Sequence, residues 1–298
     1  MIEVTDRDLL LPPGFERAPA FAPRYIPSPT VERFLAAVTS GPIDVMRLLI
    51  LMGARGDGKT SGAEFACAAL AQRVEQEGRA SALPVRVAVV RDTWQNLNRT
   101  SIPTFEEQAQ KGLPIEFREG RTEAIIRWGS RPAVHFFFFG MDSRADADKL
   151  QGFTCGVLWL EEVAPAADLA TGIPAETLGI GVGSVRQAGI PPRVLVTLNP
   201  PDPDHWILKI EKALAELGLP EVDVYKLMIS PGEKARHFRE LAAEATDPEE
   251  AHAWEQAARE FEAYRTRGQS ILELLRPDLA ARLFGGEVRG ITLGERVV

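Results

Sequence analysis

Eight consecutive residues carry the strongest chemical signal in this sequence of 298 residues: Gly53, Ala54, Arg55, Gly56, Asp57, Gly58, Lys59 and Thr60. They match the pattern G-x-x-x-x-G-K-[S/T] in full. Glycines in such a loop let backbone N–H groups turn inward around phosphate oxygens, and the following helix points its N-terminus at the same anion. Lys59 would reach the β- and γ-phosphates of ATP, and the Thr60 hydroxyl would bind Mg²⁺. The alternative is a glycine-rich turn between a strand and a helix that binds no ligand.

Two adjacent acids, Glu161 and Glu162, directly follow the apolar run Gly156–Leu160. At the carboxyl end of a parallel sheet, such acids lie in the crevice where ligands bind. Neighbouring side chains on a strand point to opposite faces, so the two acids cannot do the same job. We expect Glu161, at a position where aspartate is commoner, to hold the Mg²⁺ shell. Glu162 would orient or activate the water that attacks the γ-phosphate. A solvated strand end is the alternative.

A third apolar run, Val194–Leu198, contains Thr197 and is followed by Asn199, Pro200 and Pro201. A polar threonine or asparagine at this end of a strand could touch the γ-phosphate or its attacking water. A strand that is simply closed by a proline turn would explain the same residues without a ligand.

Apolar periodicity predicts the elements that position these residues. Expected strands are 47–52, 85–90, 115–117, 124–128, 133–139, 156–160, 194–198 and 222–229, with a hairpin turn at 118–121. Expected helices are 31–38, with Thr30 as N-cap, 60–75, and part of 93–111, broken at Pro103. Strands that alternate with helices indicate an α/β fold with a mostly parallel, wound sheet.

Changes in composition near residues 30 and 230 divide the chain into three parts. Residues 1–30 are proline-rich and are expected to be extended, and 31–230 form the α/β core. Residues 231–298 are expected to form a small helical lid or linker. Its main helix would begin with Asp247 as N-cap and Pro248 at the first position, and would stop at Gly268.

Charge and composition exclude several protein classes. The 34 Lys and Arg residues and 42 Asp and Glu residues give a net charge of −8, which argues against a protein that coats nucleic acid over its whole surface. With 45% hydrophobic residues, whole-chain disorder is excluded. Cys67 and Cys155 are expected to be buried free thiols of a reducing compartment. No signal peptide, membrane-spanning run or zinc-ligand spacing is recognisable.

The motifs together resemble the ATPase half of phage large terminase subunits, the motors that package DNA into procapsids. The resemblance runs from Pro27 to Gly290. It rests on the segments GARGDGKT, VAVVRDTWQNLNRTSIPTF, HFFFFGMDSRADADKLQGFTCGVLWLEEVAPA, VLVTLNPPDPDHWI and LRPDLAARLFGGEVRG.

The resemblance implies a RecA-like P-loop ATPase core that hydrolyses ATP with Mg²⁺. It assigns Arg55 as a cis arginine near the γ-phosphate, Glu162 as the catalytic carboxylate and Thr197 to the motif that couples hydrolysis to movement. Implied partners are double-stranded DNA, the portal protein and the small terminase subunit. The chain would be a monomer in isolation and a homo-oligomeric ring on the portal. It would lie in the host cell cytoplasm and transiently at the procapsid portal.

The sequence also departs from the family pattern. Gln151 stands where many members carry an arginine that acts in trans, and Lys149 or Arg144 would have to replace it. Pro29, Thr30 and Phe34 lie where an adenine-contacting glutamine is usual. The nuclease domain of the family is not expected in these residues, so the chain is either a fragment or has its nuclease encoded elsewhere.

Two other functions fit the same motifs: another RecA-like DNA translocase or helicase, and a nucleotide-gated scaffold that binds ATP without turnover. Five arginines are candidates for DNA contact, with solvated surface charge as the alternative for each: Arg91, Arg99, Arg118, Arg121 and Arg127.

Overall fold

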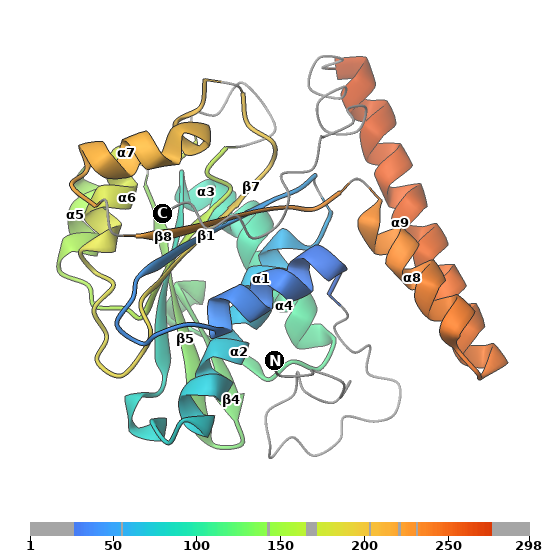
Figure 1. The fold of residues 1–298 in the computed structure, drawn as a ribbon, viewed down its shortest axis with the longest axis horizontal. Coiled ribbons are helices and arrows are strands. Elements are labelled where there is room, and N and C mark those ends of the chain that lie inside the picture. The colour runs from blue at the N-terminus through green and yellow to red at the C-terminus, as the bar shows by residue number, and fades with distance from the viewer. Residues whose placement is uncertain are drawn as a thin grey trace.

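The computed structural model describes residues 27–275, apart from Arg55, 142–143, 165–171, Pro203, 220–221 and Pro231 (Figure 1). Within that range, the side chains of residues 119, 144, 145, 147 and 264–275 are not described. The expected extended segment 1–30 therefore lies outside the described residues except for its last four. None of the described helices is both long and apolar enough to cross a membrane.

One eight-stranded sheet forms the centre of the chain, in the order β3-β4-β5-β2-β6-β7-β1-β8. Six strands run in the same direction: β1 (Arg47–Met52), β2 (Val85–Arg91), β5 (Arg131–Gly140), β6 (Val157–Glu161), β7 (Arg193–Leu198) and β8 (Asp223–Met228). The hairpin β3 (Ile115–Arg118) and β4 (Glu123–Trp128) adds an antiparallel edge beside β5. The predicted mostly parallel α/β sheet is confirmed.

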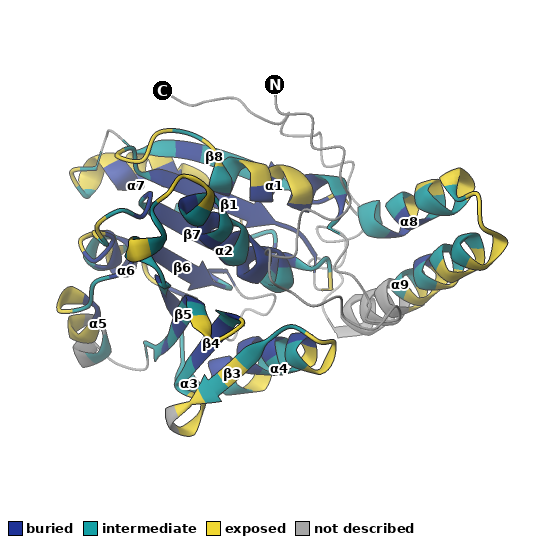
Figure 2. Cartoon of the chain, turned by 90° about the horizontal axis from the view of Figure 1, so that it is seen from below, coloured by how far each residue is buried: buried dark blue, intermediate teal, exposed yellow. Residues whose placement is uncertain are grey.

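Helices cover both faces of the sheet. In Figure 2 the strands are mostly dark blue, which marks buried residues, and they lie between the helices. On one face lie α1 (Pro29–Thr39), α2 (Lys59–Gln76) and α4 (Ile102–Gln110), and on the other α5 (Arg144–Gln151), α6 (Ala175–Val182) and α7 (Ile210–Glu216). Leu49 of β1 belongs to the first core and Leu48 to the second. Successive side chains of a strand point to opposite faces of the sheet. Because both faces are covered here, the central strands are mostly apolar on both faces.

Helix starts and stops account for the differences from the predicted elements. Helix α1 starts at Pro29 after Ser28, so Thr30 is not its N-cap. Proline at the first position loses no hydrogen bond, which favours the earlier start. Pro103 likewise lies in the first turn of α4 and does not break the helix. The irregularity is a π-helical turn before it, Leu97–Ser101, which follows the short helix α3 (Trp94–Asn96).

Three arginines, of which Arg47 and Arg193 are buried, hold the C-terminal end of α1. Arg193 donates to the carbonyl oxygens of Val38 and Ser40, at 2.8 Å each, and Arg47 donates to the Ser40 oxygen at 2.9 Å. Arg73 of α2 donates to the Gly41 oxygen at 2.8 Å. These carbonyls lack partners within the helix, and the negative end of its dipole favours cations. Burial and the neighbouring arginines lower the pKa of Arg193 to about 10.

A helical hairpin of α8 (Glu233–Glu244) and α9 (Pro248–Leu275) projects from one side of the core (Figure 1). Phe238 of α8 packs on Trp254 and Phe261 of α9, with ring centroids 5.6 and 5.5 Å apart. Asp247 caps α9 as predicted, since its Oδ1 accepts from the Glu249 amide at 3.0 Å. The predicted stop at Gly268 is wrong because α9 continues to Leu275. A glycine inside a helix costs only about 1 kcal/mol relative to alanine, so it need not end one.

Candidate nucleotide-binding site

The glycine-rich loop connects β1 to α2 at the carboxyl edge of the sheet. Its start is fixed to a neighbouring strand, because the Gly53 amide donates to the Leu198 oxygen at 3.2 Å. Gly56 and Gly58 have φ of 86° and 80°, in the left-handed region where a side chain is strained. Helix α2 begins at Lys59, directly after Gly58. The loop therefore has the geometry in which backbone amides and a helix N-terminus face one anion.

Lys59 connects this loop to the end of β7. Its Nζ donates to the Ala54 oxygen at 2.7 Å and to Asn199 Oδ1 at 3.3 Å. Lys59 and Asn199 are both buried. The structure thus brings Asn199, which follows the third apolar run, to the lysine of the phosphate loop.

The Glu161 carboxylate lies between two hydroxyl groups. Thr60 Oγ1 donates to its Oε1 at 2.7 Å, and Thr197 Oγ1 donates to its Oε2. Trp159 in turn donates from Nε1 to Thr197 Oγ1 at 3.0 Å. Glu161 is only 1% exposed, and this burial raises the pKa of its carboxyl group. The neighbouring Glu162 also raises this pKa, whereas Arg91 and the two hydroxyls lower it, and the net change is a rise.

The oxygens of Thr60 and Glu161 suit a magnesium ion. Mg²⁺ prefers carboxylate and hydroxyl oxygens, and it is usually held by one or two side chains together with phosphates and water. No cluster of three or more His, Cys, Asp or Glu side chains among the described residues would hold a metal by itself. The donor set therefore fits Mg²⁺ that arrives with a nucleotide.

Glu162 lies at the same edge but not on the strand. Strand β6 ends at Glu161, and Glu162 has φ of 51°, so the expected strand alternation does not decide its direction. Its Oε2 accepts a hydrogen bond from Arg91, the last residue of β2. Arg91 also donates to the hydroxyls of Thr100 and, at 2.9 Å, Ser101, which end the π-helical turn before α4. The second acid is thus held by an arginine, whereas the first accepts from two hydroxyls.

Comparison with known proteins finds no matching family model and no matching curated protein. Among solved structures, the chain is similar to the large terminase of the thermophilic bacteriophage D6E, with a TM-score of 0.47 and 15% identity over 72% of this chain and 50% of that chain. It resembles a phage large terminase. The same terminase in complex with ATP-gamma-S gives a TM-score of 0.44 and 18% identity, over 72% and 49% of the two chains.

The Aeropyrum pernix ORC2 protein, in its ADPNP–ADP complexes, gives a TM-score of 0.32 and 14% identity over 88% of this chain and 70% of that one. The present chain spans about half the length of the terminase that it matches. Likenesses of this degree concern the arrangement of elements.

Several residues expected in the site lie elsewhere or outside the described residues. Arg55 and the side chain of Arg144 are not described. Lys149 pairs with Asp146 at 2.5 Å on α5, and Gln151 is exposed at the end of that helix. Phe34 is fully buried in the core, so it is not available to contact an adenine base.

The five candidate arginines for DNA contact divide into two kinds. Arg91 is 4% exposed and is bound within the site, so the expectation of DNA contact is wrong for it. The charge of this residue instead holds the Glu162 carboxylate, which is partly exposed. Arg118 and Arg127 pair with Glu116, at 3.1 and 2.7 Å, and Arg121 pairs with Glu106. These three and the exposed Arg99 remain untested candidates.

Sequence reasoning missed the role of Arg91 in the site. A signal was available, because Arg91 ends a parallel strand and the ends of parallel strands meet at one edge. It also missed Glu64 of α2, which is fully buried with neither carboxylate oxygen hydrogen-bonded to another described residue. Burial raises the pKa of Glu64 well above its usual value.

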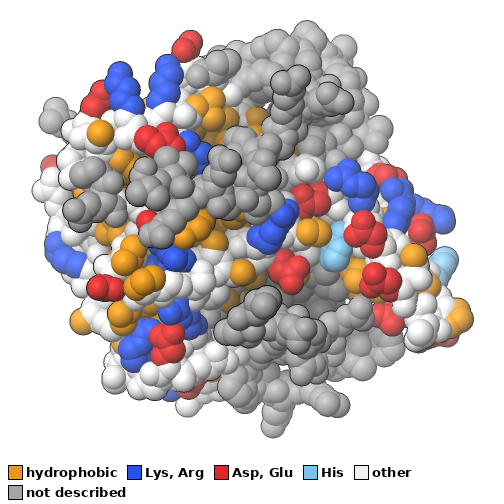
Figure 3. Space-filling view, in the orientation of Figure 1, with side chains coloured by type: hydrophobic (Ala, Val, Ile, Leu, Met, Phe, Trp, Pro, Cys, Tyr) orange, Lys and Arg blue, Asp and Glu red, His pale blue; other side chains and the backbone are white. Residues whose placement is uncertain are grey.

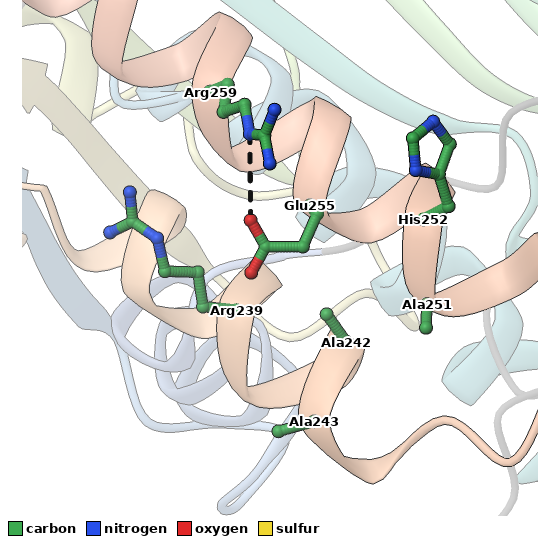
Figure 4. A pocket seen from close by; sticks show the side chains of 7 residues that line it. All are labelled: Arg239, Ala242, Ala243, Ala251, His252, Glu255 and Arg259. Atoms are coloured by element: carbon green, nitrogen blue, oxygen red, sulfur yellow. Dashed lines mark ion pairs between the residues drawn. The ribbon is translucent and has the colours of Figure 1, made fainter. Parts of the chain in front are cut away.

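A pocket of roughly 300 Å³ lies on the helical hairpin and not at the phosphate loop (Figure 4). Its walls include Ala242 and Ala243 of α8, with the ion pair of Glu255 and Arg259 of α9, at 3.8 Å, beside them. Nothing in its lining resembles the phosphate-binding arrangement of the loop. We place no nucleotide there.

Proposed function

We propose that this chain binds MgATP in the loop Gly53–Thr60 and hydrolyses it. The observation that carries the proposal is that four groups from three elements meet at one edge of the sheet. Lys59 and Thr60 start α2, Glu161 ends β6, and Asn199 follows β7. Phosphate, metal and water ligands are thus provided within a single loop cluster.

The chain's own residues divide the work. Lys59 neutralises charge that develops on the β- and γ-phosphate oxygens, and the loop amides hold the same oxygens. Thr60 and Glu161 hold Mg²⁺, which withdraws charge from the phosphates when bound. Thr197 fixes the orientation of Glu161 through its hydroxyl. Glu162 accepts the proton of the attacking water, with Arg55 acting in cis on the γ-phosphate and Asn199 contacting the same region.

We further propose that the chain is the motor domain of a viral large terminase that drives double-stranded DNA into procapsids. Support comes from the order of the motifs, including the apolar strand, Gly-x-Asp and Lys-Leu-x-Gly stretch before the two acids. Its partners would be the portal protein and the small terminase subunit, in a ring at the procapsid portal in the host cell cytoplasm. With Gln151 in place of the usual arginine, the isolated chain would be mostly monomeric and slow at hydrolysis. No second acid cluster on a strand pattern follows residue 230 in the sequence, so we expect no cleavage of DNA by these residues.

Two other functions compete with this proposal: another kind of RecA-like DNA translocase or helicase, and a nucleotide-gated scaffold that binds ATP without turnover. The presence of a second acid beside the first, held by Arg91, favours turnover over binding alone. Steady-state hydrolysis of ATP measured with and without double-stranded DNA, across protein concentration, distinguishes them. Turnover that Lys59→Ala abolishes supports the ATPase. Tight ATP binding without any turnover would support the scaffold, and turnover stimulated equally by single-stranded DNA would support a helicase.

A further inference from the structure

Lys234, in the first turn of α8, lies against the phosphate loop. A Cβ atom placed on Gly58 would lie 3.7 Å from its Nζ. The segment before α8 also runs along the loop, because the Ile229 amide donates to the Met52 oxygen at 2.8 Å. A Cβ on Gly53 would come within 3.1 Å of the Ile229 side chain. Lys234 is therefore the residue through which the helical hairpin contacts the phosphate loop.

The surroundings of Lys234 come from three further elements. Its Nζ lies 4.4 Å from the centroid of the Phe261 ring of α9 and 5.8 Å from that of Phe238. Burial, together with Lys111 at the end of α4, lowers the pKa of the amine to about 8, although Asp57 of the loop and Glu107 of α4 act in the opposite direction. An ammonium group kept among rings in this way responds strongly to any added charge nearby.

Asp57 places a negative charge at this point of the loop. It stands between two glycines of the loop, so its carboxylate accompanies the backbone that surrounds the phosphates. Its Oδ2 is buried, and a Cβ on Gly53 would lie 3.0 Å from that oxygen. A carboxylate beside a triphosphate repels it, unless a positive group offsets its charge.

We propose that Lys234 offsets the charge of Asp57 and thereby couples binding of a nucleoside triphosphate at the loop to docking of the α8–α9 hairpin. The proposal rests on the proposed function, because it assumes that the loop binds ATP. A bound triphosphate adds negative charge beside Lys234 and holds the hairpin more tightly. By reciprocity, a docked hairpin raises the affinity for the triphosphate by the same factor.

The test measures two quantities on the full chain: the affinity for MgATP and hydrogen exchange over residues 233–263, with and without nucleotide. Lys234→Met keeps the aliphatic stem on the rings and removes the charge. It should weaken MgATP binding about tenfold, within the usual range of coupling, and abolish the nucleotide-dependent protection of the hairpin. Lys234→Arg keeps the charge and should keep both properties. Lys212→Met, at an exposed lysine of α7, is the matched control and should resemble wild type.

Asp57→Asn provides the second arm and substitutes no residue of the hairpin. It should raise MgATP affinity roughly threefold by removing a negative charge beside the phosphates, and it should increase exchange of α8 without nucleotide. In the double variant, Lys234→Met should cost less than in wild type. If Lys234→Met does not fold, the Asp57→Asn exchange result decides alone.

Equal MgATP affinity and equal hairpin protection in wild type and Lys234→Met would overturn the inference, as would equal losses in Lys234→Met and Lys212→Met. An unchanged exchange of α8 in Asp57→Asn would overturn it too. The proposed function fails separately, if neither wild type nor any variant binds MgATP or if Lys59→Ala binds it as wild type does.

Discussion

Arg91, the last residue of β2, donates a hydrogen bond to the carboxylate of Glu162, which follows the last residue of β6. Arg91 is buried, whereas the Glu162 side chain is 27% exposed. The arginine therefore has a fixed position and the acid reaches from it toward the surface of the site. Since Arg91 also binds Thr100 and Ser101, the π-helical turn before α4 is tied to the same carboxylate. Such turns are frequent at functional sites.

Replacing Arg91 should separate Glu162 from the π-helical turn before α4. Arg91→Met should lower kcat about tenfold while changing KM less than about threefold, because Glu162 loses the group that positions it. Arg91→Lys should restore only part of the rate, since one ammonium group cannot reach the carboxylate and both hydroxyls together. A fall in rate matched by Arg127→Met, at a surface ion pair, would contradict a specific role.

Glu162→Gln tests the catalytic assignment. The change keeps size and hydrogen bonding but removes the negative charge and the basicity. Turnover should fall by about 10²-fold or more, the usual range for losing a general base, with MgATP affinity nearly intact. The measurement pairs calorimetric affinity with steady-state hydrolysis. Wild-type turnover in this variant would favour the nucleotide-gated scaffold.

Glu161→Gln should act on the metal instead. Its carboxylate faces the Thr60 hydroxyl, so its loss should weaken binding of Mg²⁺ with the nucleotide. Activity should fall about tenfold or more at low Mg²⁺ and recover in part as Mg²⁺ rises. A Mg²⁺ titration of both glutamine variants separates the two acids. Identical Mg²⁺ dependence in Glu161→Gln and Glu162→Gln would be evidence against the division of roles.

Lys59→Ala should abolish tight MgATP binding, because the phosphates lose the compact cation that the Ala54 oxygen and Asn199 now hold in place. A loss of roughly 100-fold or more in affinity is expected for a charge-assisted contact to phosphate in a buried loop. Calorimetry gives the affinity, and Lys212→Ala is the control for a lost surface charge. A Lys59→Ala protein with wild-type affinity would move the nucleotide away from the loop.

Patterns within one element could be predicted from the sequence, and contacts between elements could not. The sequence predicts the strand Arg47–Met52 with its observed bounds, because both of its faces are buried and every residue after Arg47 is apolar. Thr30 and Pro29 are competing helix-start signals in adjacent positions. The Thr30 hydroxyl does not cap α1 but donates to Glu233 at 2.9 Å, a partner 203 residues away that no local pattern contains. The direction of Glu162 depends on Arg91, 71 residues away, so no local pattern contains it.

The last prediction concerns Glu64, on the second turn of α2 behind the phosphate loop. The residue is fully buried, neither oxygen is hydrogen-bonded within the described residues, and burial raises the pKa of the carboxyl group well above its usual value. Below the ordinary pKa of glutamate, folded and unfolded chains both hold the proton. As pH rises past that value, the unfolded chain releases the proton while the folded chain keeps it, so the stabilisation is lost with rising pH.

Glu64→Gln has no proton to lose and resembles the neutral acid. Its melting temperature should equal that of wild type near pH 4 and exceed it increasingly toward pH 8, with each kcal/mol appearing as roughly 2–4 °C in a chain of this size. Thermal unfolding followed by circular dichroism over this range measures the difference, and Glu244→Gln, at an exposed acid of α8, is the control. A difference between Glu64→Gln and wild type that stays constant with pH would mean that Glu64 is ionised in the folded chain. In that case a cation or water must accompany it beside α2.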